Sequence, residues 1–269
     1  MDWTLIVALL VLGAATGFVA GLLGIGGGML LVPFLTMLFT LRAFPEEHLV
    51  HMAIATSLAT ILFTSMSSVR AHHKRGAVLW PVVKVLAPGI LLGSLIGAQV
   101  AGRLPTVFIA FFFAIFVGFS ALQMLRDKKP KPSRELPRPL AMFGVGNGIG
   151  FISSLVGAGG GFISVPFMVW SNVKIHNAVA TSAALGFPIA AAGTVGYIIA
   201  GASQHSLPPG TLGFVYLPAL LAVGGGSVLT APLGAKVAHS LDTGRLKRVF
   251  ALLLFVLAGY MLYRGIKAA

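Results

Sequence analysis

The chain has 269 residues, of which 57% are hydrophobic and only 9% are charged. A soluble domain carries about 25% charged residues, so the composition excludes an ordinary water-soluble fold. The net charge of +13 would suit nucleic acid in a soluble protein, but here the basic residues stand in short segments between apolar runs, where they orient a chain in a bilayer. The absence of cysteine excludes disulfides and thiolate chemistry.

Long stretches of the chain contain no Asp, Glu, Lys or Arg. A helix that crosses a bilayer needs roughly 20 apolar residues, and these stretches come close to that length or exceed it. Their apolar residues are continuous rather than alternating, which favours helices over barrel strands. We therefore predict an all-α polytopic membrane protein. The stretches cover residues 3–41, 48–69, 85–102, 104–125, 139–173 and 175–235.

Three blocks of sequence occur twice, in the same order. The longest, Gly17–Phe34, aligns without gaps with Gly150–Phe167 and is identical at ten of eighteen positions. The other pairs are HMAIATS with HNAVATS (51–57 and 176–182) and GAQVA with GAKVA (97–101 and 234–238). Such self-similarity indicates a duplicated structural unit.

The duplication divides the chain into two homologous membrane halves. We assign residues 1–125 to the first half and 140–269 to the second. The segment between them, 126–139, is rich in Lys, Arg and Pro and is predicted to be a basic cytoplasmic linker.

Each half opens with an apolar run that is too long for one helix, at residues 3–41 and 140–173. An unbroken helix of that length would extend roughly 50–60 Å, against a hydrocarbon core of about 30 Å. Either each run crosses once and continues, or it turns back at its glycines. Hairpins place fourteen basic residues on one side and four on the other, whereas single crossings divide them eleven to seven. The charge bias favours hairpins, and hence inverted repeats with 8 to 10 membrane segments and glycine-broken helices.

A glycine triplet interrupts each long run, and a proline follows five residues later. Glycine lets backbone amides approach a ligand, and the start of a helix attracts an anion. Broken helices of inverted-repeat transporters place such ends at the membrane centre. Small residues that only let helices pack closely are the alternative. The candidate anion-binding glycines are Gly26, Gly27, Gly28, Gly159, Gly160 and Gly161.

The repeated Ala-Thr-Ser triplets supply hydroxyls about 12 Å into their helices, near the bilayer centre. Thr56, Ser57, Thr181 and Ser182 could donate to an oxyanion without titrating. Equally, they could bond helix carbonyls or join neighbouring helices.

Three further residues are candidates for contact with the substrate. His51 and His176 begin the segments that carry the triplets, where a capping role is the alternative. Lys84 is the one charge inside an apolar segment, which suggests function, although a lysine near the basic loop can also extend to the membrane surface.

The acidic residues all lie in termini or loops, so no buried carboxylate is present for a cation pump or a proton relay. These residues are Asp2, Glu46, Glu47, Asp127, Glu135 and Asp242. The metalloprotease HExxH and nucleophile-elbow GxSxG patterns are also missing. We predict neither an enzyme nor a metal or cofactor site.

The doubled GxxGxGGGxxxVP block, each copy followed by Ala-Thr-Ser, together with His-x-Lys-Arg-Gly at 72–76, resembles the sulfite exporter TauE/SafE family, also called the toluene sulfonate uptake permeases. The similarity covers nearly the whole chain. It implies a secondary transporter of sulfite, thiosulfate or an organosulfonate, with about eight membrane segments. The second half has no matching basic loop, since Ser203–Gly210 contains only His205.

The sequence thus predicts a multi-pass transporter in the bacterial cytoplasmic membrane, with alternating access to an oxyanion held between two glycine-headed helices. Its partners would be the anion and the lipid bilayer, without nucleic acid. An anion channel or a non-transporting membrane scaffold is the alternative. The coupling ion, the direction of transport and the oligomeric state are left open.

Overall fold

The structure is a computed structural model that describes residues 3–23, 27–126, 135–204, 206–237 and 243–268. Gly26, His205, the linker residues 127–134 and the acidic residues Asp2, Asp127 and Asp242 lie outside these ranges. The elements are α1 (Trp3–Leu23), α2 (Gly28–Leu41), α3 (Leu49–His73), α4 (Trp80–Ala101), α5 (Thr106–Arg126), α6 (Pro139–Val156), α7 (Gly161–Trp170), α8 (Ile175–Gly201), β1 (Thr211–Leu212), β2 (Val215–Tyr216), α9 (Leu217–Val237) and α10 (Thr243–Ala268).

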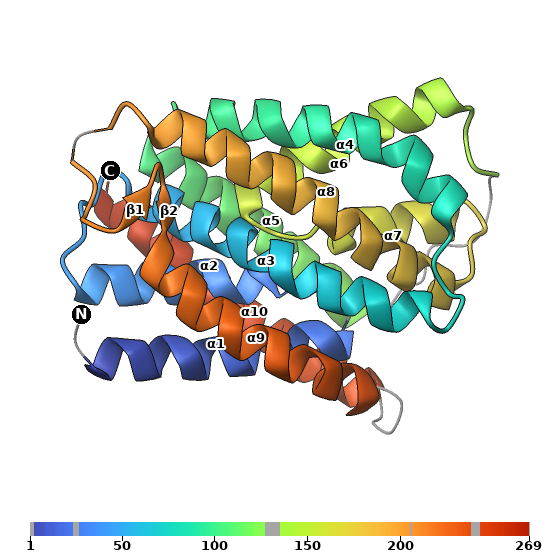
Figure 1. Cartoon of the computed structure of the whole chain (residues 1–269), viewed down its shortest axis with the longest axis horizontal. Coiled ribbons are helices and arrows are strands. Elements are labelled where there is room, and N and C mark those ends of the chain that lie inside the picture. The colour runs from blue at the N-terminus through green and yellow to red at the C-terminus, as the bar shows by residue number, and fades with distance from the viewer. Residues whose placement is uncertain (1–2, 24–26, 127–134, 205, 238–242, 269) are drawn as a thin grey trace.

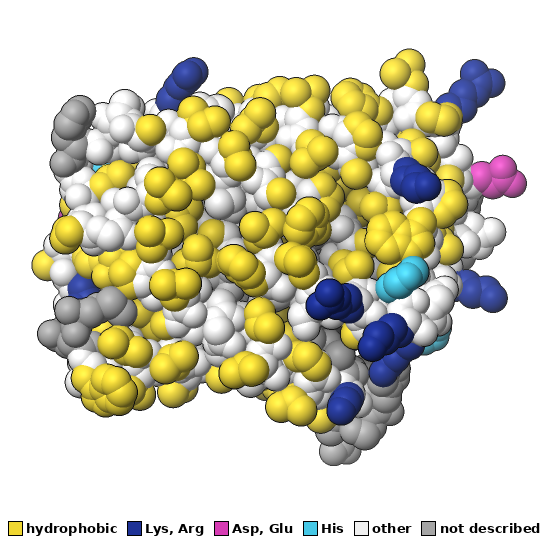
Figure 2. All heavy atoms as spheres, in the orientation of Figure 1, with side chains coloured by type: hydrophobic (Ala, Val, Ile, Leu, Met, Phe, Trp, Pro, Cys, Tyr) yellow, Lys and Arg dark blue, Asp and Glu magenta, His cyan; other side chains and the backbone are white. Residues whose placement is uncertain are grey.

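The prediction of an all-α polytopic membrane protein is confirmed. Within the described ranges, eight helices are long and apolar enough to cross a membrane, and α2 and α7 are shorter apolar helices. Strands β1 and β2 form a small antiparallel hairpin before α9. Large apolar side chains such as Ile115 and Val256 are exposed on the outside of the bundle, at 70% and 69%. Yellow hydrophobic atoms accordingly cover much of the face in Figure 2, as expected of a surface in contact with lipid.

Both long apolar runs break at their glycines. Gly27 and Gly160 have φ angles of 64° and 74°, a left-handed conformation that glycine adopts without steric cost, and each immediately precedes a short helix. The two ends of the first run lie together: the guanidinium of Arg42, after α2, donates to the hydroxyl of Thr4, at the start of α1, over 3.2 Å. The hairpin interpretation therefore holds for this run.

Helices of the two halves interdigitate (Figure 1). α1 packs along α9, and α6, which carries the second copy of the α1 sequence, packs along α4. The pairs α3 with α8 and α5 with α10 also join one half to the other. α1 begins at the end of the molecule where both chain termini lie, whereas α6 begins at the opposite end (Figure 1).

The centre of the molecule is occupied by α3, which is buried over most of its length, and by α8 beside it. Beside this pair, glycines permit a close contact between α4 and α6. A Cβ at Gly93 or Gly97 of α4 would overlap α6, so these two helices touch backbone to backbone. The repeated Ala-Thr-Ser triplets lie on α3 and α8, at the interface between the halves.

Candidate functional site

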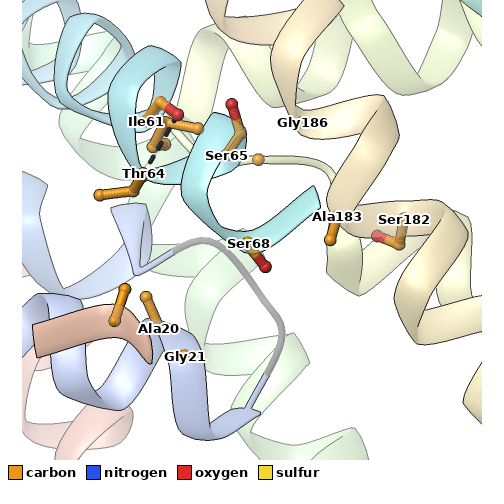
Figure 3. Close-up of a pocket in the computed structure, with 11 residues that line it drawn as sticks. Ala20, Gly21, Ile61, Thr64, Ser65, Ser68, Ser182, Ala183 and Gly186 are labelled. Carbon is orange, nitrogen blue, oxygen red and sulfur yellow. Dashed lines mark hydrogen bonds between the residues drawn. The ribbon is translucent and has the colours of Figure 1, made fainter. Parts of the chain in front are cut away.

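A small cavity lies where the two halves meet, beside α3 and α8 (Figure 3). Its volume is about 30 Å³, which suffices for two or three water molecules. None of the side chains that line it is charged. The lining residues are Ala20, Gly21, Ile61, Thr64, Ser65, Ser68, Gly159, Ser182, Ala183, Gly186 and Ala231.

Hydroxyl groups reach the cavity from both halves. Figure 3 shows Thr64, Ser65 and Ser68 on α3 and Ser182 on α8. The Ser65 hydroxyl donates to the carbonyl of Leu62 over 3.1 Å, within its own helix. The Ser182 hydroxyl shares a hydrogen bond with the hydroxyl of Ser164 over 2.8 Å, and Ser164 Oγ also lies 3.0 Å from the carbonyl oxygen of Gly160. The cavity is therefore uncharged and mostly apolar, with hydroxyl groups on both sides.

The start of α7 borders this cavity through Gly159, and all three glycines of the triplet are buried. The first N–H groups of a helix have no partner within the helix. Beside them lies Ser153 of α6, which is 3% exposed. Its Oγ has no hydrogen-bond partner in the described structure and stands 3.2 Å from the position that a Cβ of Gly160 would occupy. A buried hydroxyl without a partner is thus directed at a helix N-terminus.

The start of α2 is packed differently. A Cβ at Gly28 would overlap the carbonyl oxygen of Gly157, so the start of α2 lies against the end of α6. The hydroxyl of Ser57 donates to the same carbonyl over 2.9 Å. At Gly28 the close-packing interpretation of the glycine has direct support. Neither Gly27 nor Gly28 lines the cavity.

The two threonines of the triplets bond across the halves. The hydroxyl oxygen of Thr56 accepts the N–H of Tyr216, and that of Thr181 accepts the N–H of Leu79, both over 3.0 Å. Gly159 and Ser182 line the cavity. The other predicted residues are buried but do not line it: Gly160, Gly161, Thr56, Ser57 and Thr181. The structure thus brings two of the predicted residues together on one cavity surface.

The histidines and the lysine lie elsewhere. His51 is buried, and its Nε2–H points at the carbonyl oxygens of Ala101 and Leu104, at 3.1 and 3.0 Å, which is the capping role considered as the alternative. His176 is exposed on the first turn of α8, and Lys84 is exposed on α4. None of the three lines the cavity.

Comparison with known proteins decides the family. The family model of the sulfite exporter TauE/SafE matches residues 9–261. The chain belongs to the sulfite exporter TauE/SafE family. A family relative from Haemophilus influenzae, a probable membrane transporter protein, is 38% identical. The similarity extends over 95% of this chain and 97% of the relative. A probable membrane transporter protein of Bacillus subtilis is 28% identical, with 97% of this chain and 98% of the relative covered. No solved structure matches the chain.

The family and its relatives make this TauE/SafE protein a multi-pass membrane transporter. The cavity suits that activity, because hydroxyls and helix amides can bind an ion and release it without forming a covalent bond. Among the described residues, no group of three or more His, Asp or Glu side chains is placed to hold a metal ion.

Sequence reasoning missed Thr64, Ser65, Ser68 and Ser153. The first three lie beyond the repeated triplet on α3. Ser153 stands in the repeated glycine block, but its counterpart in the first half is Ala20, which carries no hydroxyl. A comparison of the two halves for polar differences would have identified Ser153 as a candidate.

Proposed function

We propose that the protein is a secondary transporter of a small sulfur-containing anion, such as sulfite, thiosulfate or an organosulfonate, in the bacterial cytoplasmic membrane. The family name supports this substrate class. The observation that carries the proposal is the neutral cavity between the halves, which is lined by hydroxyls and bordered by the start of α7. Neutral donors and a helix N-terminus favour an anion over a cation.

In this proposal the anion lies against the amides of Gly160 and Gly161 and accepts hydrogen bonds from hydroxyls on both sides. Ser182 donates from α8, and Ser65 donates from α3 after its hydroxyl turns away from the carbonyl of Leu62, which ties the anion to both halves. The unpartnered hydroxyl of Ser153 does not line the cavity as it stands, and in this proposal it joins the shell from α6 when the walls separate. Thr56, Ser57 and Thr181 do not contact the anion in this proposal. Their bonds to backbone groups hold the helices of the two halves together around the site.

The size of the cavity implies that the site opens and closes. About 30 Å³ is too small for an oxyanion with four or more heavy atoms, so the substrate requires the walls to separate. The walls belong to different halves, and relative motion of the halves would widen the cavity. The opposite starting ends of α1 and α6 support an inverted repeat, in which such motion exposes the site to each side in turn (Figure 1).

A channel requires a continuous wet path, and the pocket between the halves is small and lined mainly by apolar residues, which supports the transporter. Two measurements on the purified protein test this. Thermal stabilisation by sulfite, thiosulfate and sulfoacetate, with chloride as the control, would reveal the substrate class. In proteoliposomes, uptake of the stabilising anion should saturate and show counterflow. Flux without saturation would indicate a channel, and the absence of both binding and flux would leave a scaffold.

A further inference from the structure

A groove between α3 and α9 runs along the outside of the bundle, apolar over most of its length and basic at one end. The basic part has a volume of about 490 Å³ and includes Arg70 and Lys74. The apolar part has a volume of about 440 Å³ and passes over Gly224 and Gly225 of α9. Phe63 and Val228 line both parts, so the two form one continuous surface. Each part alone has the size of a ligand pocket.

The α3 side of this groove is a single stripe of the helix. Phe63, Arg70 and Lys74 recur at spacings of seven and four residues, which places them on one face. All three are exposed, with Phe63 at 48%. Figure 2 shows Lys and Arg side chains gathered at the end of the molecule where α3 finishes, with few at the opposite end of this face. The positive charge of the groove thus lies at one end of an apolar surface.

The α9 side leaves space that the protein itself does not fill. A Cβ at Gly225 would meet no atom within 4 Å. On either side of this glycine, Leu221 and Leu229 are 75% and 76% exposed. The surface is therefore hollow at the glycine and apolar around it. An occupant with an extended apolar chain and a negatively charged end would match both parts.

We propose that this groove binds a phospholipid with an anionic headgroup. The phosphate lies between Arg70 and Lys74, and an acyl chain follows the surface over Gly225. Basic side chains near a membrane surface each favour an anionic lipid by about 1 kcal/mol, so the pair corresponds to a preference of roughly thirty-fold over a zwitterionic lipid. Since α3 belongs to the first half and α9 to the second, the bound lipid spans the interface between the halves.

The test compares phosphatidylglycerol with phosphatidylcholine of identical acyl chains, added in equal amounts to the purified full-length protein and detected by native mass spectrometry. We expect phosphatidylglycerol to be retained in clear excess. The double variant Arg70→Gln/Lys74→Gln should retain both lipids equally. The matched control Arg138→Gln/Lys174→Gln removes two exposed charges outside the groove and should keep the preference. Equal retention by the unaltered protein, or equal loss in the control, overturns the proposal.

A second variant tests the apolar part. Gly225→Leu places a side chain in open space, so it should fill the groove without disturbing the fold and should lower lipid retention. Gly148→Leu on α6, where a Cβ also meets nothing within 4 Å, should not. If inorganic phosphate displaces the lipid and Gly225→Leu has no effect, the basic end is a site for free anions. If Gly225→Leu changes only the oligomeric state, the groove is an interface between copies. Either result contradicts lipid binding.

Discussion

The side-chain oxygen of Thr56 accepts a hydrogen bond from the backbone N–H of Tyr216, which lies 160 positions further along the chain. Tyr216 immediately precedes α9. In the second half, Thr181 accepts the N–H of Leu79, which immediately precedes α4. α4 carries the GAQVA block and α9 ends within the GAKVA block, so each threonine holds the start of the corresponding helix in the other half. The threonines of the two triplets therefore connect the halves in the same way.

This relationship predicts that neighbouring residues on α8 have different roles. Thr181→Val removes the partner of the half-buried N–H of Leu79, which should lower the free energy of unfolding by about 1 kcal/mol. Ser182→Ala removes a cavity hydroxyl, and the loss of a hydrogen bond to an anion should weaken its binding roughly ten- to hundred-fold. Thermal unfolding and anion titration of both variants would separate the effects. Equal loss of affinity in both would place Thr181 in the site as well.

Removal of the Ser153 hydroxyl should affect the stability of the protein and its affinity for the anion differently. Because it has no partner, Ser153→Ala removes an unsatisfied buried polar group, and the stability of the protein without substrate should stay equal or rise. The affinity for the transported anion should fall by about tenfold. Melting temperatures measured with and without the anion provide both values. A stable variant with full affinity would show that Ser153 takes no part in binding.

The glycine at the start of α2 is tightly packed against the end of α6. Gly28→Ala forces a Cβ against the carbonyl of Gly157 and to 2.9 Å from the Cα of Ala158, which should cost about 1–3 kcal/mol. Gly118→Ala on α5 is the matched control, since its Cβ meets only the Cβ of Ala258, at 4.0 Å. Thermal denaturation in detergent should show the first variant to be less stable. If Gly28→Ala is fully stable but transports nothing, the glycine serves the anion instead.

Both chain termini lie at one end of the bundle, and this predicts the topology (Figure 1). The basic loop around Gly76 follows α3 and lies at the opposite end, where positive charge marks the cytoplasmic side. A reporter that is active only outside the cytoplasm should therefore work when fused after residue 269. The same reporter inserted at Gly76 should be inactive. A cytoplasmic signal from the C-terminal fusion would contradict the inverted repeat.

The fold followed from features that the sequence displays directly. The charge-free runs marked the helices, and the glycine triplets marked both breaks, because an uninterrupted helix of that length does not fit a bilayer. Whether the first run turns back or crosses once could be weighed only through the distribution of basic residues. The hydrogen bond between Arg42 and Thr4 shows that it turns back.

The cavity residues were harder to predict, because hydroxyl side chains occur at many positions along α3 and do not single out the face that lines the cavity. Thr181 and Ser182 differ by about 100° around their helix, and the sequence does not tell which one faces the cavity. Ser65 gave no repeat signal, since the equivalent position in the second half is Ala190. Only the packing of one half against the other brings Ser65 and Ser182 to the same cavity.

The pairing of α1 with α9 has a consequence for how the protein is made. α1 leaves the ribosome first, yet Thr230 of α9, whose hydroxyl donates to the carbonyl of Ala14, follows 216 positions later. At about 5–20 residues per second, roughly 10–40 seconds pass before that partner is synthesised. Throughout this interval the bare faces at Gly13 and Gly17, which α9 later covers backbone to backbone, are in contact with lipid or with the insertion machinery. A chain that stops before α9 leaves this small-residue face permanently uncovered, where cellular quality control can detect it.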